Sequence, residues 1–190
     1  MFRKKSSIWL AMLLGLISLG LACDSAQVDK ANKLAKEATD IYNKTVDPSN
    51  KTVDSFNELM GDNLVKADDL EEYKTKNKAK FDELISQCDQ LEKSRNEAAG
   101  KFEEASKIDV DAKFKEYCAL KGQDYRKRAE ADKARGAFIK TFLAEKDVAK
   151  INQQTADYNK KSGDMSKEAA DISDKAEKVI KDNPSSFDSK

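Results

Sequence analysis

Apolar residues recur at alternating spacings of three and four over most of the chain. The clearest run is Phe81, Leu84, Cys88, Leu91, Arg95, Ala98, Phe102 and Ala105, in which Arg95 is the one polar member. This spacing places a single apolar stripe on an α-helix over about three and a half heptads. A similar run covers residues 148–179, and weaker runs cover residues 28–45 and 110–143. The pattern predicts an all-α protein made of long amphipathic helices.

Glycine and proline are scarce, with 7 and 2 copies in 190 residues, which excludes a hairpin-rich β-fold. Cap and stop residues predict helices near 25–46, 48–60, 67–107, 110–145 and 147–182. A narrow apolar stripe cannot stabilise one helix alone, so we expect an elongated antiparallel bundle or coiled coil of three to four long helices. This domain would span residues 23–182, followed by a flexible tail over 183–190. Alternatively, residues 67–145 form one helix that self-associates through coiled-coil faces.

The first 22 residues have the composition of an export signal. Arg3, Lys4 and Lys5 precede Ile8–Leu21, a stretch without charged residues. As a helix, this stretch extended to Ala22 would be roughly 22 Å long, shorter than the roughly 30 Å hydrocarbon core of a bilayer. We therefore expect a cleaved signal peptide over 1–22.

The exit of this segment, Leu19-Gly20-Leu21-Ala22-Cys23, resembles the lipobox of bacterial lipoproteins. The resemblance implies cleavage after Ala22 and attachment of a diacylglycerol to the thiol of Cys23, which would anchor the chain to a lipid bilayer. Gly20 departs from the pattern, which prefers leucine at that position. Ordinary cleavage after Ala22, giving a soluble secreted protein, and an uncleaved anchor are the alternatives.

The charge balance and the absence of histidine limit the chemistry. Lysine and arginine total 35, as do aspartate and glutamate, so the basic excess typical of a nucleic-acid-binding protein is missing. Without histidine the chain lacks the usual general base and the commonest metal ligand. The acidic residues at 68–72 and at 109 and 111 lack the glycine and terminal glutamate of an EF-hand loop. We expect no enzyme activity, no cofactor and no metal site.

Cys88 and Cys118 are the remaining thiols, and outside the cytoplasm such a pair commonly forms a disulfide. The phase of the apolar stripe predicts a helix–helix turn near residue 108. Cys88 would then face a residue near 128, roughly 15 Å from Cys118 along the helix, whereas a disulfide requires Cα atoms within about 7 Å. Either the turn lies near 100–106 and the thiols are bonded, or they stay apart.

Two local motifs receive structural interpretations. The basic cluster Tyr125–Arg128 has acidic neighbours on the same predicted helix, which favours a solvated face. The sequence Asn43–Asp47 recurs seven residues later as Asn50–Asp54, which indicates a duplicated heptad that keeps Val46 and Val53 on one face.

These features together predict a non-enzymatic lipoprotein of the bacterial cell envelope. It would be a helical scaffold or binding module, tethered through Cys23 to the inner or outer membrane and facing the periplasm or the cell exterior. Its partner would be an envelope protein or peptidoglycan. One alternative is cell-wall attachment through the terminal Lys190, which is similar to the murein lipoprotein, whose last lysine is joined to peptidoglycan. Another is a surface-exposed adhesin or ligand binder.

Overall fold

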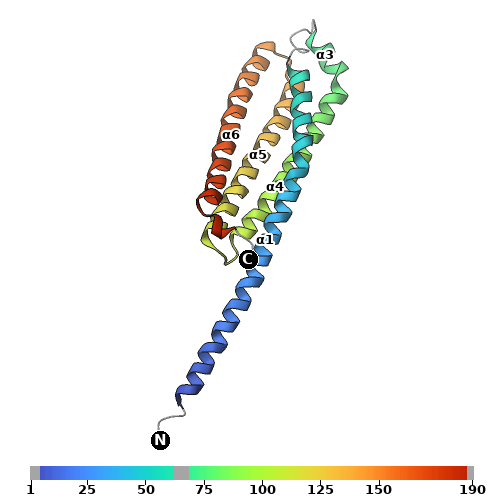
Figure 1. Ribbon diagram of the computed structural model, residues 1–190. Coiled ribbons are helices and arrows are strands. Elements are labelled where there is room, and N and C mark those ends of the chain that lie inside the picture. Colours follow the sequence, from blue (N-terminus) through green and yellow to red (C-terminus); the bar gives the residue numbers. More distant parts are fainter. Residues whose placement is uncertain (1–4, 62–68, 188–190) are drawn as a thin grey trace.

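A computed structural model describes residues 5–61 and 69–187, with side chains from residue 25 onward (Figure 1). Every element in these ranges is helical, which confirms the expected all-α bundle. The elements are α1 (Lys5–Met60), α3 (Leu70–Lys76), α4 (Lys78–Ser106), α5 (Ala112–Ala144), α6 (Val148–Asp182) and the 3-10 helix η1 (Pro184–Ser186).

The four long helices run up and down in chain order (Figure 1). Close backbone packing joins α1 to α4, α4 to α5 and α5 to α6. The N-terminal part of α1 extends past one end of the bundle, where residues 107–111 and η1 also lie (Figure 1). We call this the proximal end. Residues 145–147, between α5 and α6, lie at the opposite, distal end (Figure 1).

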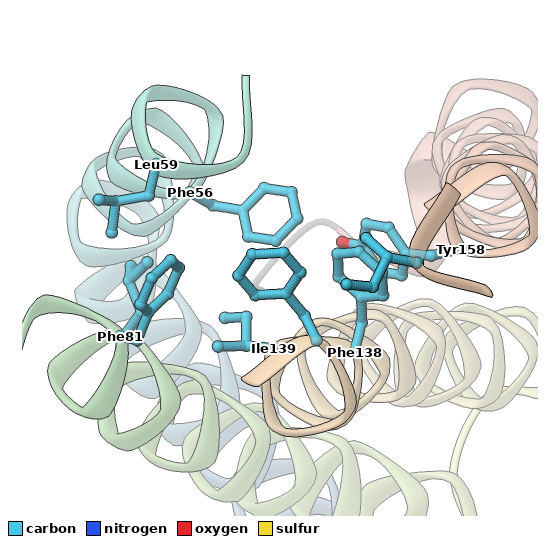
Figure 2. Packing of buried hydrophobic residues seen from close by; sticks show 9 residues of the cluster. Phe56, Leu59, Phe81, Phe138, Ile139 and Tyr158 are labelled. Atoms are coloured by element: carbon cyan, nitrogen blue, oxygen red, sulfur yellow. The ribbon is translucent and has the colours of Figure 1, made fainter. Parts of the chain in front are cut away.

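The core consists of two separate clusters. The distal cluster joins all four long helices and comprises Phe56, Leu59, Phe81, Leu84, Phe138, Ile139, Phe142, Ile151 and Tyr158. Figure 2 shows its rings directed toward one another, with Phe138 of α5 stacked on Tyr158 of α6 at a centroid distance of 4.5 Å. The proximal cluster joins α1, α4 and α5 and comprises Ala38, Ala98, Ala99, Phe102, Ala105, Cys118 and Tyr125. Small residues dominate it, so the helices can approach closely there.

Helix α1 continues through Pro48, so the predicted helix break at Asp47-Pro48 is wrong. A proline inside a helix costs about 3 kcal/mol, because its N–H is missing and its ring clashes with the preceding turn. Packing on both sides of the proline offsets this cost. Thr45 and Thr52 are both buried, and the single proton of the Thr52 hydroxyl is within reach of two acceptors, the Pro48 carbonyl at 2.8 Å and Gln87 Oε1 of α4 at 3.1 Å.

The same residues explain the duplicated heptad. Its buried members are Thr45 and Thr52, while Val46 is 39% exposed. The repeat therefore places equivalent residues on one face, as predicted, but the face that packs in the core carries threonine rather than valine.

The remaining boundaries follow from local capping. Asp147 caps α6 by accepting hydrogen bonds from the amides of Ala149 and Lys150, and the helix begins within one residue of the predicted boundary. Asp69 caps α3 in the same way, and a break at Asn77 separates α3 from α4. The turn at 107–111 excludes a single helix over 67–145.

The C-terminal tail, expected to be flexible, packs on the bundle as far as Phe187. The ring of Phe187 lies 5.5 Å from that of Tyr117 and 6.1 Å from that of Phe114, measured between centroids. In the part of the chain that the structure describes, no helix has both the length and the apolarity to cross a membrane.

Candidate functional site

The predicted anchor residues, Ala22 and Cys23, lie in the N-terminal part of α1, outside the residues whose side chains are described. Lys190 also lies outside the described residues. The structure therefore gives the backbone context of the anchor but no side-chain geometry for it.

The two thiols are free and buried in different parts of the bundle. Cys88 of α4 lies beside Gly136 of α5, whereas Cys118 belongs to the proximal cluster. Gly136 and Cys118 are eighteen residues apart on α5, roughly 27 Å along the helix. Of the two alternatives left open by the sequence, the structure matches the one with the turn near residue 108, and this register keeps Cys88 and Cys118 apart and unbonded.

Burial also suppresses thiol chemistry. It raises the pKa of the Cys88 thiol to about 11 and that of the Cys118 thiol to about 12. At neutral pH both residues are protonated thiols rather than nucleophilic thiolates.

A layer of charged side chains runs along α5 from the level of the proximal cluster toward the distal cluster. We define this charged layer as Arg95 of α4 with Lys121, Asp124, Arg128, Asp132 and Arg135 of α5. The Asp132 carboxylate accepts from Arg95 Nη1 at 2.6 Å and from Arg135 Nη1 at 3.1 Å. The Asp124 carboxylate accepts from Arg128 Nε at 2.7 Å and from Lys121 Nζ at 3.1 Å. Each aspartate thus bridges two cations.

Aromatic rings extend this layer to α1 and α6. Tyr42 of α1 stacks on Tyr125 of α5, with their ring centroids 3.9 Å apart. The guanidinium carbons of Arg95 and Arg128 lie 5.9 and 5.8 Å from the Tyr42 centroid. Such cation–π contacts stabilise guanidinium groups that have lost water. Arg135, another member of the layer, also interacts with Tyr158 of α6, so the layer connects all four long helices.

The charged layer contains more positive than negative charge. Its four cations face two carboxylates, both of which are 1% exposed. Burial raises the pKa of Asp132, against the opposing effect of Arg95 and Arg135, so desolvation is the largest influence on that carboxylate. Arg95 Nε is buried and has no hydrogen-bond partner in the described structure. Burying such a group of charges lowers the stability of the folded state unless each charged group also has hydrogen-bond partners.

The sequence predicted a solvated face for the cluster Tyr125–Arg128, and this holds for the partly exposed Arg126, Lys127 and Arg128 but not for the buried Tyr125. Tyr125 is buried, Arg128 pairs with a buried aspartate, and Arg126 forms a two-pronged pair with Glu103 of α4 at 2.8 and 2.9 Å. Lys127 pairs with the exposed Glu130 and Glu168. Two features of the sequence could have indicated the charged layer. Arg95 interrupts an apolar stripe, and cations recur every seven residues at 121, 128 and 135.

The charged layer offers groups that could bind an anion. Within the described ranges no group of three potential metal ligands is close enough to hold an ion. The layer presents N–H and O–H donors and fixed positive charge, which attract anions.

Comparison of the chain with protein-family models, with curated proteins and with solved structures gives no match.

Proposed function

We propose that the protein is a lipid-anchored helical bundle of the bacterial envelope, which acts by binding or scaffolding rather than by catalysis. The observation that carries this proposal is the lipobox-like exit Leu19–Cys23 behind a basic and then apolar leader. Two or three acyl chains, at about 0.8 kcal/mol per buried methylene, would hold the protein stably on a bilayer.

The backbone context of Cys23 supports this proposal. Helix α1 is continuous from Lys5 to Met60, and Ala31 is already buried in the bundle. Cys23 and Ala31 are eight residues apart, roughly 12 Å along a helix. An acylated Cys23 would therefore hold the proximal end near the headgroups, and α6, of 35 residues, would extend about 50 Å from it.

The same geometry favours a tethered bundle over cell-wall attachment through Lys190. Phe187 packs at the proximal end, so the tail starts on the same side of the bundle as Cys23. A chain that links the membrane to the cell wall would be expected to have its wall-attached tail at the distal end, away from the lipid anchor.

The test is metabolic labelling with radioactive palmitate, combined with mass analysis of the mature N-terminus. We expect label in wild type and in Cys88→Ala, and none in Cys23→Ala, because acylation requires the Cys23 thiol. The Cys88→Ala variant is the matched control, since it removes a buried cysteine. A mature chain that begins at an unmodified Cys23 would contradict the proposal and support ordinary secretion.

A further inference from the structure

The strongest candidate for an unassigned site is one corner of the charged layer, formed by Tyr42, Arg95, Tyr125 and Arg128. Arg128 uses its Nε on Asp124, which leaves its terminal guanidinium nitrogens without a hydrogen-bond acceptor in the described structure. The hydroxyls of Tyr42 and Tyr125 likewise have no acceptor among the described residues, and both lie within electrostatic range of the Arg128 guanidinium. These donors surround one stacked pair of tyrosine rings, and the described residues supply no acceptor for them.

A second, independent observation is the orphaned Nε of Arg95. Arg95 is 7% exposed, its Nη1 donates to Asp132, and that nitrogen also lies 3.4 Å from the backbone carbonyl of Arg128. Its guanidinium thus lies next to the Arg128 segment, against the same Tyr42 ring. A buried N–H without an acceptor is unfavourable, so the charge of Arg95 is incompletely compensated by the described residues.

The charge of the layer identifies the kind of acceptor. Four cations and two carboxylates leave an excess of two positive charges, which a dianion would balance. The Arg128 side chain is 34% exposed, so the corner can be reached from solvent without unfolding. Guanidinium and hydroxyl donors in this combination match the oxygens of a phosphate group.

We propose that Arg128, Tyr42 and Tyr125, backed by Arg95, bind a phosphate group, either as free phosphate or as the phosphoester of a larger molecule. The bound group accepts hydrogen bonds from Arg128 and the two hydroxyls and neutralises the excess charge of the layer. This inference does not depend on the lipid anchor.

The test is isothermal titration calorimetry of the purified protein with inorganic phosphate and with glycerol 3-phosphate, each against sodium chloride of equal ionic strength. We expect saturable binding of at least one phosphate compound and none of chloride. Tighter binding of inorganic phosphate would identify the free anion as the ligand, and tighter binding of glycerol 3-phosphate would identify a phosphoester. Absence of saturable binding for both would overturn the proposal.

Three variants locate the site. Arg128→Met should weaken phosphate binding at least roughly tenfold, since it removes a charged donor. Tyr42→Phe removes one hydroxyl but keeps the ring stack, and should weaken binding severalfold even if Arg128→Met does not fold. Lys127→Met, the adjacent lysine among exposed acids, removes the same charge and should bind like wild type. Unchanged affinity in Tyr42→Phe and in a folded Arg128→Met, or equal losses in Lys127→Met, would contradict the assignment.

Discussion

Individual charged residues differ widely in what they contribute, because their burial differs. The pairs Lys36–Asp40 and Lys78–Asp82 lie on exposed helix faces, where solvent screening leaves ion pairs with little effect on stability. Asp132 is a different case, since its carboxylate is enclosed and bonded to Arg95 and Arg135. Removing one member of such a group leaves its partners buried without compensation.

Asp132→Ala should therefore lower the free energy of unfolding by about 3–5 kcal/mol, because two guanidinium groups lose their shared counter-ion. Urea denaturation followed by circular dichroism measures the change. Asp109→Ala is the matched control, since its side chain is 95% exposed, and it should have little effect. Similar stabilities of the two variants would show that the charged layer does not contribute to the stability of the bundle.

Cys88 and Cys118 should react with an alkylating reagent only when the bundle opens. Both thiols are fully buried, and their pKa values are raised to about 11 and about 12, so the thiolate is scarce at pH 8. Peptide-resolved mass spectrometry after alkylation should find both sites unmodified in native protein and modified in denaturant. Rapid labelling of either site in native protein would contradict this packing.

At the scale of elements, the α4–α5 pair is the central unit of the bundle, and its close approach depends on small residues. Gly122 and Gly136 of α5 are both buried against α4. A Cβ at Gly136 would lie 3.3 Å from Cys88 Cβ, an atom fixed by the α4 backbone. A Cβ at Gly163 of α6, by contrast, would meet nothing within 4 Å.

Alanine should therefore have opposite effects at these two helix positions. Gly163→Ala should stabilise the protein by about 0.5–1 kcal/mol through helix propensity and reduced chain entropy. Gly136→Ala should destabilise it by about 1 kcal/mol, because α4 and α5 must move apart. Thermal unfolding of both variants tests the pair, and a gain in Gly136→Ala would show that the interface is looser than the structure indicates.

The start of α5 should make stability depend on pH. Asp111 accepts hydrogen bonds from the amides of Phe114 and Lys113, which hold its pKa below the ordinary value of 3.8. The folded carboxylate binds protons less readily than the unfolded one, so its stabilising effect is present above pH 3.8 and is lost as the pH falls through its folded pKa.

Asp111→Asn separates this effect from capping itself, because asparagine caps helices about as well as aspartate without ionising. We expect the variant to match wild type at pH 7 and to lose less stability than wild type between pH 5 and pH 2, measured by urea denaturation. Identical pH profiles would rule out a contribution from the Asp111 carboxylate.

At the scale of the whole molecule, both described termini of the bundle lie at its proximal end, and the distal end is one helix length away (Figure 1). Helix α5, of 33 residues, separates the turn at 107–111 from the turn at 145–147 by about 50 Å. If Cys23 carries the lipid, these two turns should lie at very different heights above the bilayer.

A fluorophore at Lys107→Cys should be quenched strongly by nitroxide-labelled lipid headgroups, and one at Lys146→Cys should be quenched little. Membrane-bound protein is compared with the same labelled chains in detergent without quencher, which controls for local environment. Equal quenching at both positions would mean that the bundle lies flat on the membrane.

Much of the fold could be predicted from local pattern. The apolar spacing of three and four identified α4 and α6, and Asp147 marked the start of α6. The candidate site was harder to predict, because the environment of Arg128 depends on contact with Tyr42, more than eighty residues earlier in the chain. No local rule distinguishes that arginine from Lys127 beside it.

The sequence by itself determined the helical character of the chain, its amphipathic stripes and caps, and a leader that resembles a lipoprotein signal, because these depend on residues within a few turns of one another. The tertiary structure alone decided that α1 passes through Pro48, that the cysteines stay apart and that a charged layer lies inside the bundle. Those outcomes depend on the register between helices, which is set by packing energies summed over residues far apart in the chain.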